Sequence, residues 1–350
     1  MIFCRLLCRY DYGSFNENNG MALLTQAESV LDDAVQVDSF TLVEYQIKRI
    51  PLAIRHQKPM NKLSQASTKE IIRHQEGYFV GADGLQLYYQ SWYPQAKTKA
   101  IVIVVHGLGV HSNIFDKVVE FLVAHNYGVY GLDLRGHGRS PGQRGYINSW
   151  REFREDLKAF HQLVIEKEPN LPLFLLGQSL GGTISLDYAL RFGEKLQGVI
   201  LLSPALAVGI SPLKIAVGKI LSRLMPRFSL DTGIRLITSS RDPEIIKTLA
   251  EDPLRHTRGT ARLSTEFMQT VAWIKNNTEM LQVPLLILHG GADKIASPES
   301  SRLLFEQITF DDKERKLYPE SYHVLQNDIN YQEILADLGD WLDKHLESRK

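Results

Sequence analysis

The chain has few cysteines, no net charge and no long apolar run. Its two cysteines, Cys4 and Cys8, lie in the first ten of 350 residues, so the rest of the chain can form neither a disulfide nor a cysteine metal cluster. With 40 acidic and 40 basic residues, it offers no electrostatic reason to expect a nucleic-acid partner. No apolar stretch approaches the roughly 20 residues that a membrane-spanning helix needs.

The N-terminal residues lack the pattern of a secretory signal. Residues 1–9 are interrupted by Arg5, are too short for a signal-peptide core and carry no cleavage pattern, so we expect a cytoplasmic protein. Residues 1–75 are predicted to form an appendage, with helical spacing over 22–35 and a Lys- and Arg-rich stretch over 48–73. A docking helix with a solvated linker is favoured, and contact with an anionic membrane or partner is the alternative.

From Tyr78 onward, strand-like and helix-like segments alternate. Residues 78–92 alternate around Asp83-Gly84, which is a hairpin signal. Short apolar runs then recur between helical segments, at residues 100–105, 128–132, 173–176, 198–202 and 284–288. This alternation predicts an α/β fold whose mostly parallel central sheet is flanked by helices, with the core over 76–203 and 278–350.

The alternation stops over residues 204–277, which we predict to be a helical cap inserted above the sheet's active edge. One segment, 213–225, has an apolar stripe at i, i+3, i+4 spacing with basic residues beside it: Leu213, Ala216, Val217, Ile220, Leu221 and Leu224, flanked by Lys214, Lys219 and Arg223. Packing of this stripe on the body is favoured. Peripheral membrane contact, with the basic side chains extending along the lipid interface, is the alternative.

The most informative motif is Gly177-x-Ser179-x-Gly181, at the end of an apolar run. A strand, a glycine turn, a serine and then a helix are the setting that holds a nucleophilic serine on a strained, exposed turn. The two glycines let neighbouring backbones pack closely around it. Because a serine hydroxyl is a poor nucleophile at neutral pH, it needs a base beside it and donors facing it. The structural alternative is a glycine-rich loop whose serine caps a helix.

His323 is the favoured base. In enzymes with this serine turn the chain order is Ser, then Asp or Glu, then His. His323 lies between a strand-like segment, 315–318, and the last helix, where a parallel sheet gathers its site. The other downstream histidines lie in the insertion, at a strand end and in a charged terminal helix; they are His256, His289 and His345.

Asp293 is the favoured carboxylate. It follows a glycine turn at the end of a buried strand, where it would fix the imidazole tautomer and stabilise the imidazolium. Asp133 also ends a predicted strand but precedes Ser179, and Glu320 is too close to His323 in sequence. The alternative for Asp293 is a turn or helix-capping role.

Two backbone N–H groups are predicted to stabilise a developing oxyanion. One belongs to Leu180, directly after the serine. The other belongs to Leu108, in a loop after an earlier strand, where Gly107 and Gly109 allow an unusual backbone.

Together these segments resemble the monoacylglycerol lipase and lysophospholipase-like branch of the serine α/β-hydrolases. The matching pieces follow the family's order over residues 76–348: His106-Gly-Leu-Gly109 with His111-Ser112, Asp133-Leu-Arg-Gly-His-Gly-Arg-Ser140, residues 171–182, Ser203-Pro204, Asp252-Pro-Leu254, Gly290-Gly-Ala-Asp293 and Tyr322-His-Val-Leu325. The resemblance implies Ser179 as nucleophile, Asp293 as acid, His323 as base, and Leu108 and Leu180 as oxyanion-hole residues. It also implies the α/β-hydrolase fold and hydrolysis of small or single-chain lipid esters, without cofactor or metal, beneath a mobile cap.

We therefore expect a serine ester hydrolase with a small lipid ester as its substrate. A peptidase or amidase on the same fold is an alternative, but it would need an acidic subsite, and the cap offers only scattered Glu244, Glu251 and Glu266. A general small-ester carboxylesterase is a further alternative. A non-catalytic binding protein is disfavoured by the complete Ser, Asp and His set. Gln178, where the lipase often has His, leaves the chemistry intact but unsettles the substrate.

Overall fold

The computed structural model describes residues 73–206 and 212–347, with the side chains of 212–215 and 347 outside that description. The predicted N-terminal helix and most of the basic stretch therefore lie outside the described residues. The first strand begins at Arg73, slightly before the expected start of the core.

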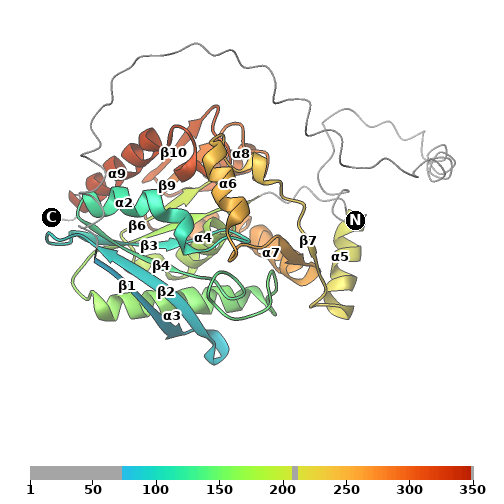
Figure 1. Ribbon diagram of the computed structural model, residues 1–350. Coiled ribbons are helices and arrows are strands. Elements are labelled where there is room, and N and C mark those ends of the chain that lie inside the picture. Colours follow the sequence, from blue (N-terminus) through green and yellow to red (C-terminus); the bar gives the residue numbers. More distant parts are fainter. Residues whose placement is uncertain (1–72, 207–211, 348–350) are drawn as a thin grey trace, which may run out of the picture. The chain divides into compact units, whose positions relative to one another are not determined.

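Within the described residues, the fold is built around an eight-stranded sheet (Figure 1). Its order is β1-β2-β4-β3-β5-β6-β9-β10, antiparallel from β1 to β4 and parallel thereafter. The strands are β1 (Arg73–Val80), β2 (Gln86–Tyr93), β3 (Ala100–Val105), β4 (Tyr127–Leu132), β5 (Leu173–Gln178), β6 (Gly198–Leu202), β9 (Leu285–Gly290) and β10 (Lys313–Tyr318). The predicted mostly parallel sheet is confirmed, and it is entered through a hairpin whose turn contains Asp83 and Gly84.

Helices cover both faces of this sheet because the side chains of the central strands alternate between two apolar layers. In β3, Ile101 and Ile103 face one layer, whereas Val102 and Val104 face the other. The first layer is covered by α3 (Trp150–Lys167) and α4 (Leu180–Phe192), and the second by α2 (Asp116–Ala124) and α9 (Tyr331–Glu347). A further helix, α8 (Pro298–Gln307), precedes β10.

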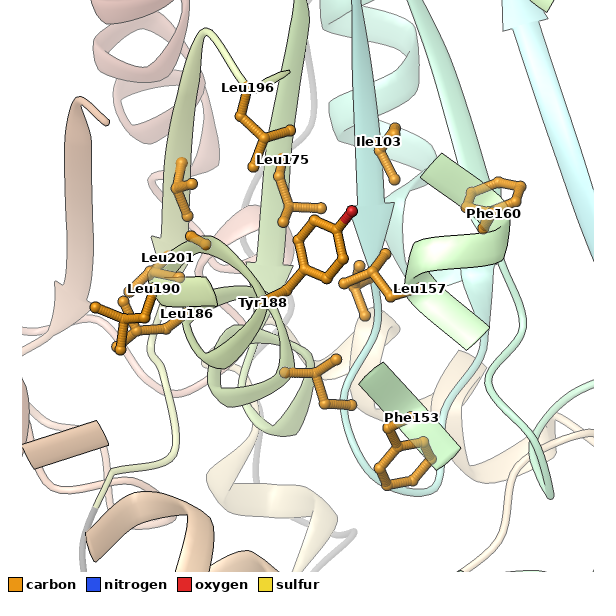
Figure 2. Close-up of a cluster of buried hydrophobic side chains, with 14 of the residues drawn as sticks. Ile103, Phe153, Leu157, Phe160, Leu175, Leu186, Tyr188, Leu190, Leu196 and Leu201 are labelled. Carbon is orange, nitrogen blue, oxygen red and sulfur yellow. The ribbon is translucent and has the colours of Figure 1, made fainter. Parts of the chain in front are cut away.

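Figure 2 shows how α4 is fixed in the first layer. Tyr188 of α4 lies among Leu157 and Phe160 of α3 and Leu175 of β5, and all four side chains are buried. Burial of such side chains stabilises a fold by about 1.5–3 kcal/mol each. The helix that follows the Gly-x-Ser-x-Gly turn is thus held firmly against the strand that precedes it.

The residues between β6 and β9 are called the cap here. The described part of the cap contains α5 (Pro212–Leu224), α6 (Pro243–Glu251) and α7 (Ala261–Lys275). It also contains a small antiparallel sheet of β7 (Ser229–Asp231) and β8 (Arg258–Thr260), which the sequence pattern did not predict. Strands of three residues are too short to show an alternating pattern, and these two contain only one large apolar residue, Leu230.

Candidate active site

Ser179 lies on the sharp turn between β5 and α4. Its backbone has φ 55° and ψ −118°, a conformation that costs a non-glycine residue about 1–3 kcal/mol. Backbone hydrogen bonds hold it there: its N–H donates to Leu202 O at 3.0 Å, and its carbonyl accepts from Ala205 N at 3.1 Å. A Cβ at Gly181 would approach Val105 O to 2.1 Å, so only glycine fits there. The serine is half-buried at the end of a central strand.

Asp293 and His323 meet because their strands are neighbours. Asp293 follows β9 and His323 follows β10, and the C-terminal ends of these parallel strands open at one edge of the sheet. The two side chains are buried, and His323 Nδ1 lies 2.7 Å from Asp293 Oδ2. The other carboxylate oxygen, Oδ1, accepts the N–H groups of Ile295 at 2.7 Å and Ala296 at 3.0 Å. Backbone donors thus orient Asp293 through Oδ1, while Oδ2 contacts the imidazole.

The charge state of Asp293 sets the tautomer of His323. Burial alone would raise the pKa of Asp293, but the His323 imidazole and hydrogen bonds from His289 and His323 outweigh it and hold that pKa well below its usual range. An ionised carboxylate accepts a hydrogen bond from Nδ1–H, which keeps the proton on Nδ1. The imidazole therefore keeps Nε2 unprotonated, which is the form a general base requires.

A second histidine adjoins the same carboxylate. His289, expected only as a strand-end residue, is buried with Nε2 3.4 Å from Asp293 Oδ2 and 3.0 Å from Ala296 O. Because a carbonyl can only accept, Nε2 carries the proton and its positive edge faces the carboxylate. The only sequence signal was that His289 and Asp293 are four residues apart across a strand-to-turn segment.

The two competing carboxylates lie elsewhere. Asp133 is buried and accepts from Ser112 N at 2.9 Å, Ser112 Oγ at 2.6 Å and Arg139 N at 2.8 Å, so it braces two loops. Glu320 points outward, and its Oε2 lies 3.3 Å from Arg241 Nη1. Neither is hydrogen-bonded to His323 within the described residues.

The loop after β3 adjoins the serine turn. A Cβ at Gly107 would lie 3.0 Å from Ser179 Cβ, and Leu108 follows in a half-buried position. Gly109 has φ +77°, and a Cβ there would approach His256 O to 2.1 Å. On the other side of the serine, Leu180 is the first residue of α4, where helical N–H groups lack intrahelical partners. The two N–H groups predicted to form an oxyanion hole thus belong to segments that flank Ser179.

Histidines join the cap to this loop. The imidazoles of His137 and His256 lie 4.7 Å apart between centroids, and those of His106 and His137 lie 5.3 Å apart. The backbone N–H of cap residue His256 donates to Gly109 O at 2.9 Å. Burial lowers the pKa of His106 to about 3, that of His256 to about 4 and that of His137 well below its usual range, so this stack is neutral at physiological pH.

A largely apolar cavity of about 580 Å³ lies between α6 and the loop after β3. Its apolar lining comes from the core and the cap together: Val110, Ile114, Ile245, Leu249 and Leu254. His111 and Asp252 meet at its wall, with Nε2 2.7 Å from Oδ2. Among the described residues, no side chains cluster as metal ligands, and no helix is long and apolar enough to span a bilayer.

The chain is similar in fold and in sequence to several known proteins. Residues 96–330 match the Hydrolase_4 family, described as serine aminopeptidase, S33. A monoacylglycerol lipase of Mycolicibacterium smegmatis is 31% identical over 277 residues, which cover 77% of this chain and 98% of that relative. A crystal structure of Paleococcus ferrophilus monoacylglycerol lipase has a TM-score of 0.67 and 34% identity, covering 74% of this chain and 99% of that chain.

A monoglyceride lipase of Saccharomyces cerevisiae, solved in complex with a substrate analog, has a TM-score of 0.70 and 27% identity, covering 79% of this chain and 96% of that chain. These matches confirm the resemblance inferred from the sequence segments and favour ester hydrolysis over the peptidase alternative. The chain therefore belongs to the Hydrolase_4 family and is a carboxylic ester hydrolase of the monoacylglycerol-lipase-like serine α/β-hydrolases.

Proposed function

We propose that the chain hydrolyses monoacylglycerols and related single-chain lipid esters through an acyl-enzyme on Ser179. The observation that carries the catalytic part is the 2.7 Å contact between Asp293 and His323 at the same sheet edge as the strained serine turn. The substrate class rests on the relatives named above, together with the apolar cavity beside the loop after β3.

The proposed reaction follows from these groups. His323 Nε2 takes the proton of Ser179 Oγ as Oγ attacks the ester carbonyl, and Asp293 stabilises the resulting imidazolium. The N–H groups of Leu108 and Leu180 donate to the oxyanion of the tetrahedral intermediate. The imidazolium then protonates the leaving glycerol oxygen as the C–O bond breaks. Water, deprotonated by His323, attacks the acyl-enzyme and releases the fatty acid.

A substrate panel tests this proposal. We expect kcat/KM, measured by fatty-acid release, to be higher for long-chain monoacylglycerols than for lysophosphatidylcholine. It should also exceed the kcat/KM of p-nitrophenyl acetate, measured by p-nitrophenol release, because each methylene of an acyl chain that binding removes from water contributes binding free energy. A preference for the acetyl ester would reject the lipid assignment. Hydrolysis of aminoacyl p-nitroanilides at a comparable rate would instead support the peptidase alternative.

We further propose that α5 makes peripheral contact with a membrane. Part of the apolar stripe is half-buried, at Val217 and Leu221, on a helix that packs against α7. The other part is open to solvent: Ile220 is 56% exposed and Leu224 is 75% exposed. Exposed apolar residues follow the helix at Met225 and Phe228, and the basic side chains of Lys219 and Arg223 on α5 are also exposed. The side chain of Leu213 lies outside the described residues. Exposed apolar groups flanked by basic ones suit an anionic lipid interface.

The double variant Ile220→Ser, Leu224→Ser is expected to bind vesicles of phosphatidylcholine and phosphatidylglycerol at least about tenfold more weakly than the wild type. One inserted aliphatic side chain contributes roughly 1.5 kcal/mol or more, which is about a tenfold change in partitioning. Sedimentation with vesicles measures this. Leu303→Ser, which alters a 43% exposed leucine on α8, is the matched control and should bind like the wild type. Equal binding by all three proteins would remove α5 from the interface.

A further inference from the structure

The backbone on both sides of His323 is held by two hydrogen-bond acceptors, one in the cap and one later in the same loop. The N–H of Val324 donates to Ser239 O, a cap residue, at 2.7 Å. The N–H of Tyr322 donates to Asp328 Oδ2 at 2.7 Å, and Asp328 is completely buried. The direction of the imidazole therefore depends on where Ser239 and Asp328 lie.

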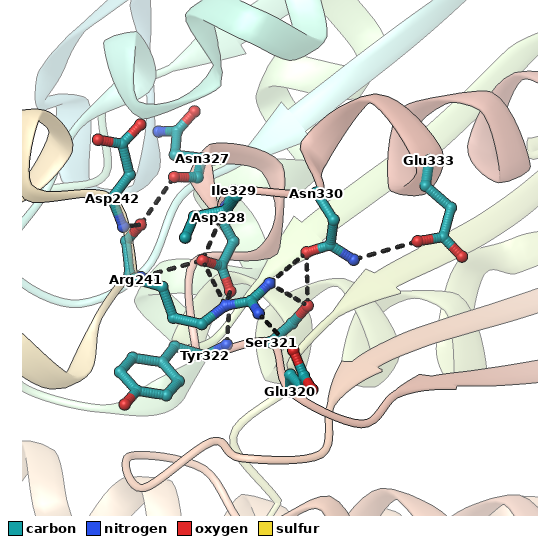
Figure 3. Close-up of polar contacts among 11 residues, drawn as sticks. Arg241, Asp242, Glu320, Ser321, Tyr322, Asn327, Asp328, Ile329, Asn330 and Glu333 are labelled. Atoms are coloured by element: carbon teal, nitrogen blue, oxygen red, sulfur yellow. Dashed lines mark hydrogen bonds and ion pairs between the residues drawn. The ribbon is translucent and has the colours of Figure 1, made fainter. Parts of the chain in front are cut away.

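Arg241 connects these two supports (Figure 3). Its Nε lies 3.1 Å from both carboxylate oxygens of Asp328, and its backbone N–H donates to Oδ1 at 2.9 Å. Its Nη2 donates to Asn330 Oδ1 at 2.7 Å and lies 3.4 Å from Ser321 Oγ. Its Nη1 lies 3.3 Å from Glu320 Oε2. One guanidinium thus contacts residues on both sides of His323.

The neighbouring cap residues add to this connection. Ser240 Oγ donates to Asn327 O at 2.8 Å, and Asn327 Nδ2 donates to Ile114 O at 3.0 Å. The segment 239–242, named the cap root here, is therefore bonded to the histidine loop, residues 319–330, at several points. A planar guanidinium is the side chain that can span several acceptors in one fixed geometry.

We infer that Arg241 is a positioning residue: through Asp328 and the histidine loop it holds the His323 imidazole in line with Ser179, so that the position of the cap root controls acyl transfer. This inference rests on the proposed roles of Ser179 and His323. Without Arg241, the buried Asp328 carboxylate loses its cationic partner, and the loop that carries Tyr322 shifts to rehydrate it. A displacement of about 1 Å in a catalytic group is enough to lower a rate by roughly 100-fold.

Arg241→Gln is expected to lower kcat roughly 10- to 100-fold on a soluble p-nitrophenyl butyrate substrate, with KM changed by less than about threefold. A soluble ester is used so that membrane binding does not enter the rate. Arg241→Lys keeps the positive charge but loses the planar arrangement of several N–H donors. Its kcat should lie between those of the glutamine variant and the wild type.

Arg154→Gln is the matched control. Arg154 also pairs with a fully buried carboxylate, Asp187, through Nε at 2.7 Å, and the two arginine side chains are similarly covered, 18% exposed for Arg154 and 21% for Arg241. Asp187 has a second cationic partner, Arg191, whose Nε lies 2.9 Å from Oδ1. It lies on α3, away from the histidine loop. We expect Arg154→Gln to lose stability to urea, by less than Arg241→Gln because Arg191 still pairs with Asp187, while its kcat stays within about threefold of the wild type.

A milder variant covers the case in which Arg241→Gln does not fold. Asn330→Ala removes one acceptor of the guanidinium and leaves no buried charge unpaired, and it should lower kcat several-fold without changing KM. Equal kcat losses in Arg241→Gln and Arg154→Gln, or a wild-type kcat in Asn330→Ala, would overturn the inference. Full activity of Ser179→Ala or His323→Ala would instead refute the proposed function itself.

Discussion

Ser179→Ala is expected to lower kcat by about 10⁵- to 10⁶-fold and to abolish labelling by a fluorophosphonate probe, while the protein remains folded. Without Oγ no acyl-enzyme can form, and the residual rate comes only from water attacking an ester bound in the oxyanion hole. The backbone should be retained because alanine meets the same strain at φ 55° as serine does. Hydrolysis of p-nitrophenyl butyrate and in-gel labelling measure the two effects.

Ser185→Ala is the control for this substitution. Ser185 is also on α4, and its buried Oγ has no hydrogen-bond partner within the described residues, so its removal should leave both rate and labelling unchanged. Labelling that persists in Ser179→Ala and disappears in another serine variant would move the nucleophile to that other serine.

Asp293→Asn is expected to lower kcat by about 10⁴-fold with a small change in KM. The amide presents an N–H group toward Nδ1 of His323 and so favours the tautomer that is protonated on Nε2, which cannot accept the serine proton. Asp187→Asn, another buried carboxylate, is the control, and it should lose stability but keep kcat within an order of magnitude. Comparable kcat losses in both variants would indicate a general effect of removing a buried charge.

Asp293→Asn is also expected to change how the free energy of unfolding depends on pH. The pKa of Asp293 is held below its usual range, so folding favours the ionised form. That contribution is fully present above the unfolded-state pKa of about 3.9 and is lost as the pH falls toward the lower folded-state value. The urea midpoint of the wild type should therefore fall more steeply on acidification below about pH 4 than that of Asp293→Asn. Parallel curves would contradict this contribution.

The core of the fold was predictable because the central strands are buried on both faces. Such strands must be apolar at every position, so the runs at 100–105 and 198–202 coincide with β3 and β6. The meeting of Asp293 and His323 was predictable for a related reason. In a parallel sheet, loops after successive strands converge at one edge, and chain order then selects among the downstream histidines.

What the sequence pattern missed depends on contacts between distant residues. Arg241 and Asp328 are 87 residues apart, and an arginine before a helix has no periodicity that would point to a partner. His289 was predicted to be a strand-end residue, because its approach to Asp293 depends on how the intervening turn folds. The apolar stripe on α5 is half-buried in one part and exposed in another. The sequence did not predict this division, because the pattern of one helix does not reveal how much of its surface a neighbouring element covers.

The two ends of the cap leave neighbouring strands, since β6 pairs directly with β9 and Leu202 lies opposite Leu288. Because the two ends of an insertion between adjacent strands lie close together, exchanging it for another segment leaves the register of the sheet intact. The cap is thus a natural unit for grafting between relatives to exchange substrate range. Two contacts between the cap and the core limit such an exchange. A transplanted cap must supply its own partners for Asp328 and for Gly109 O, or it will fold correctly above a histidine loop and a β3 loop that it no longer aligns.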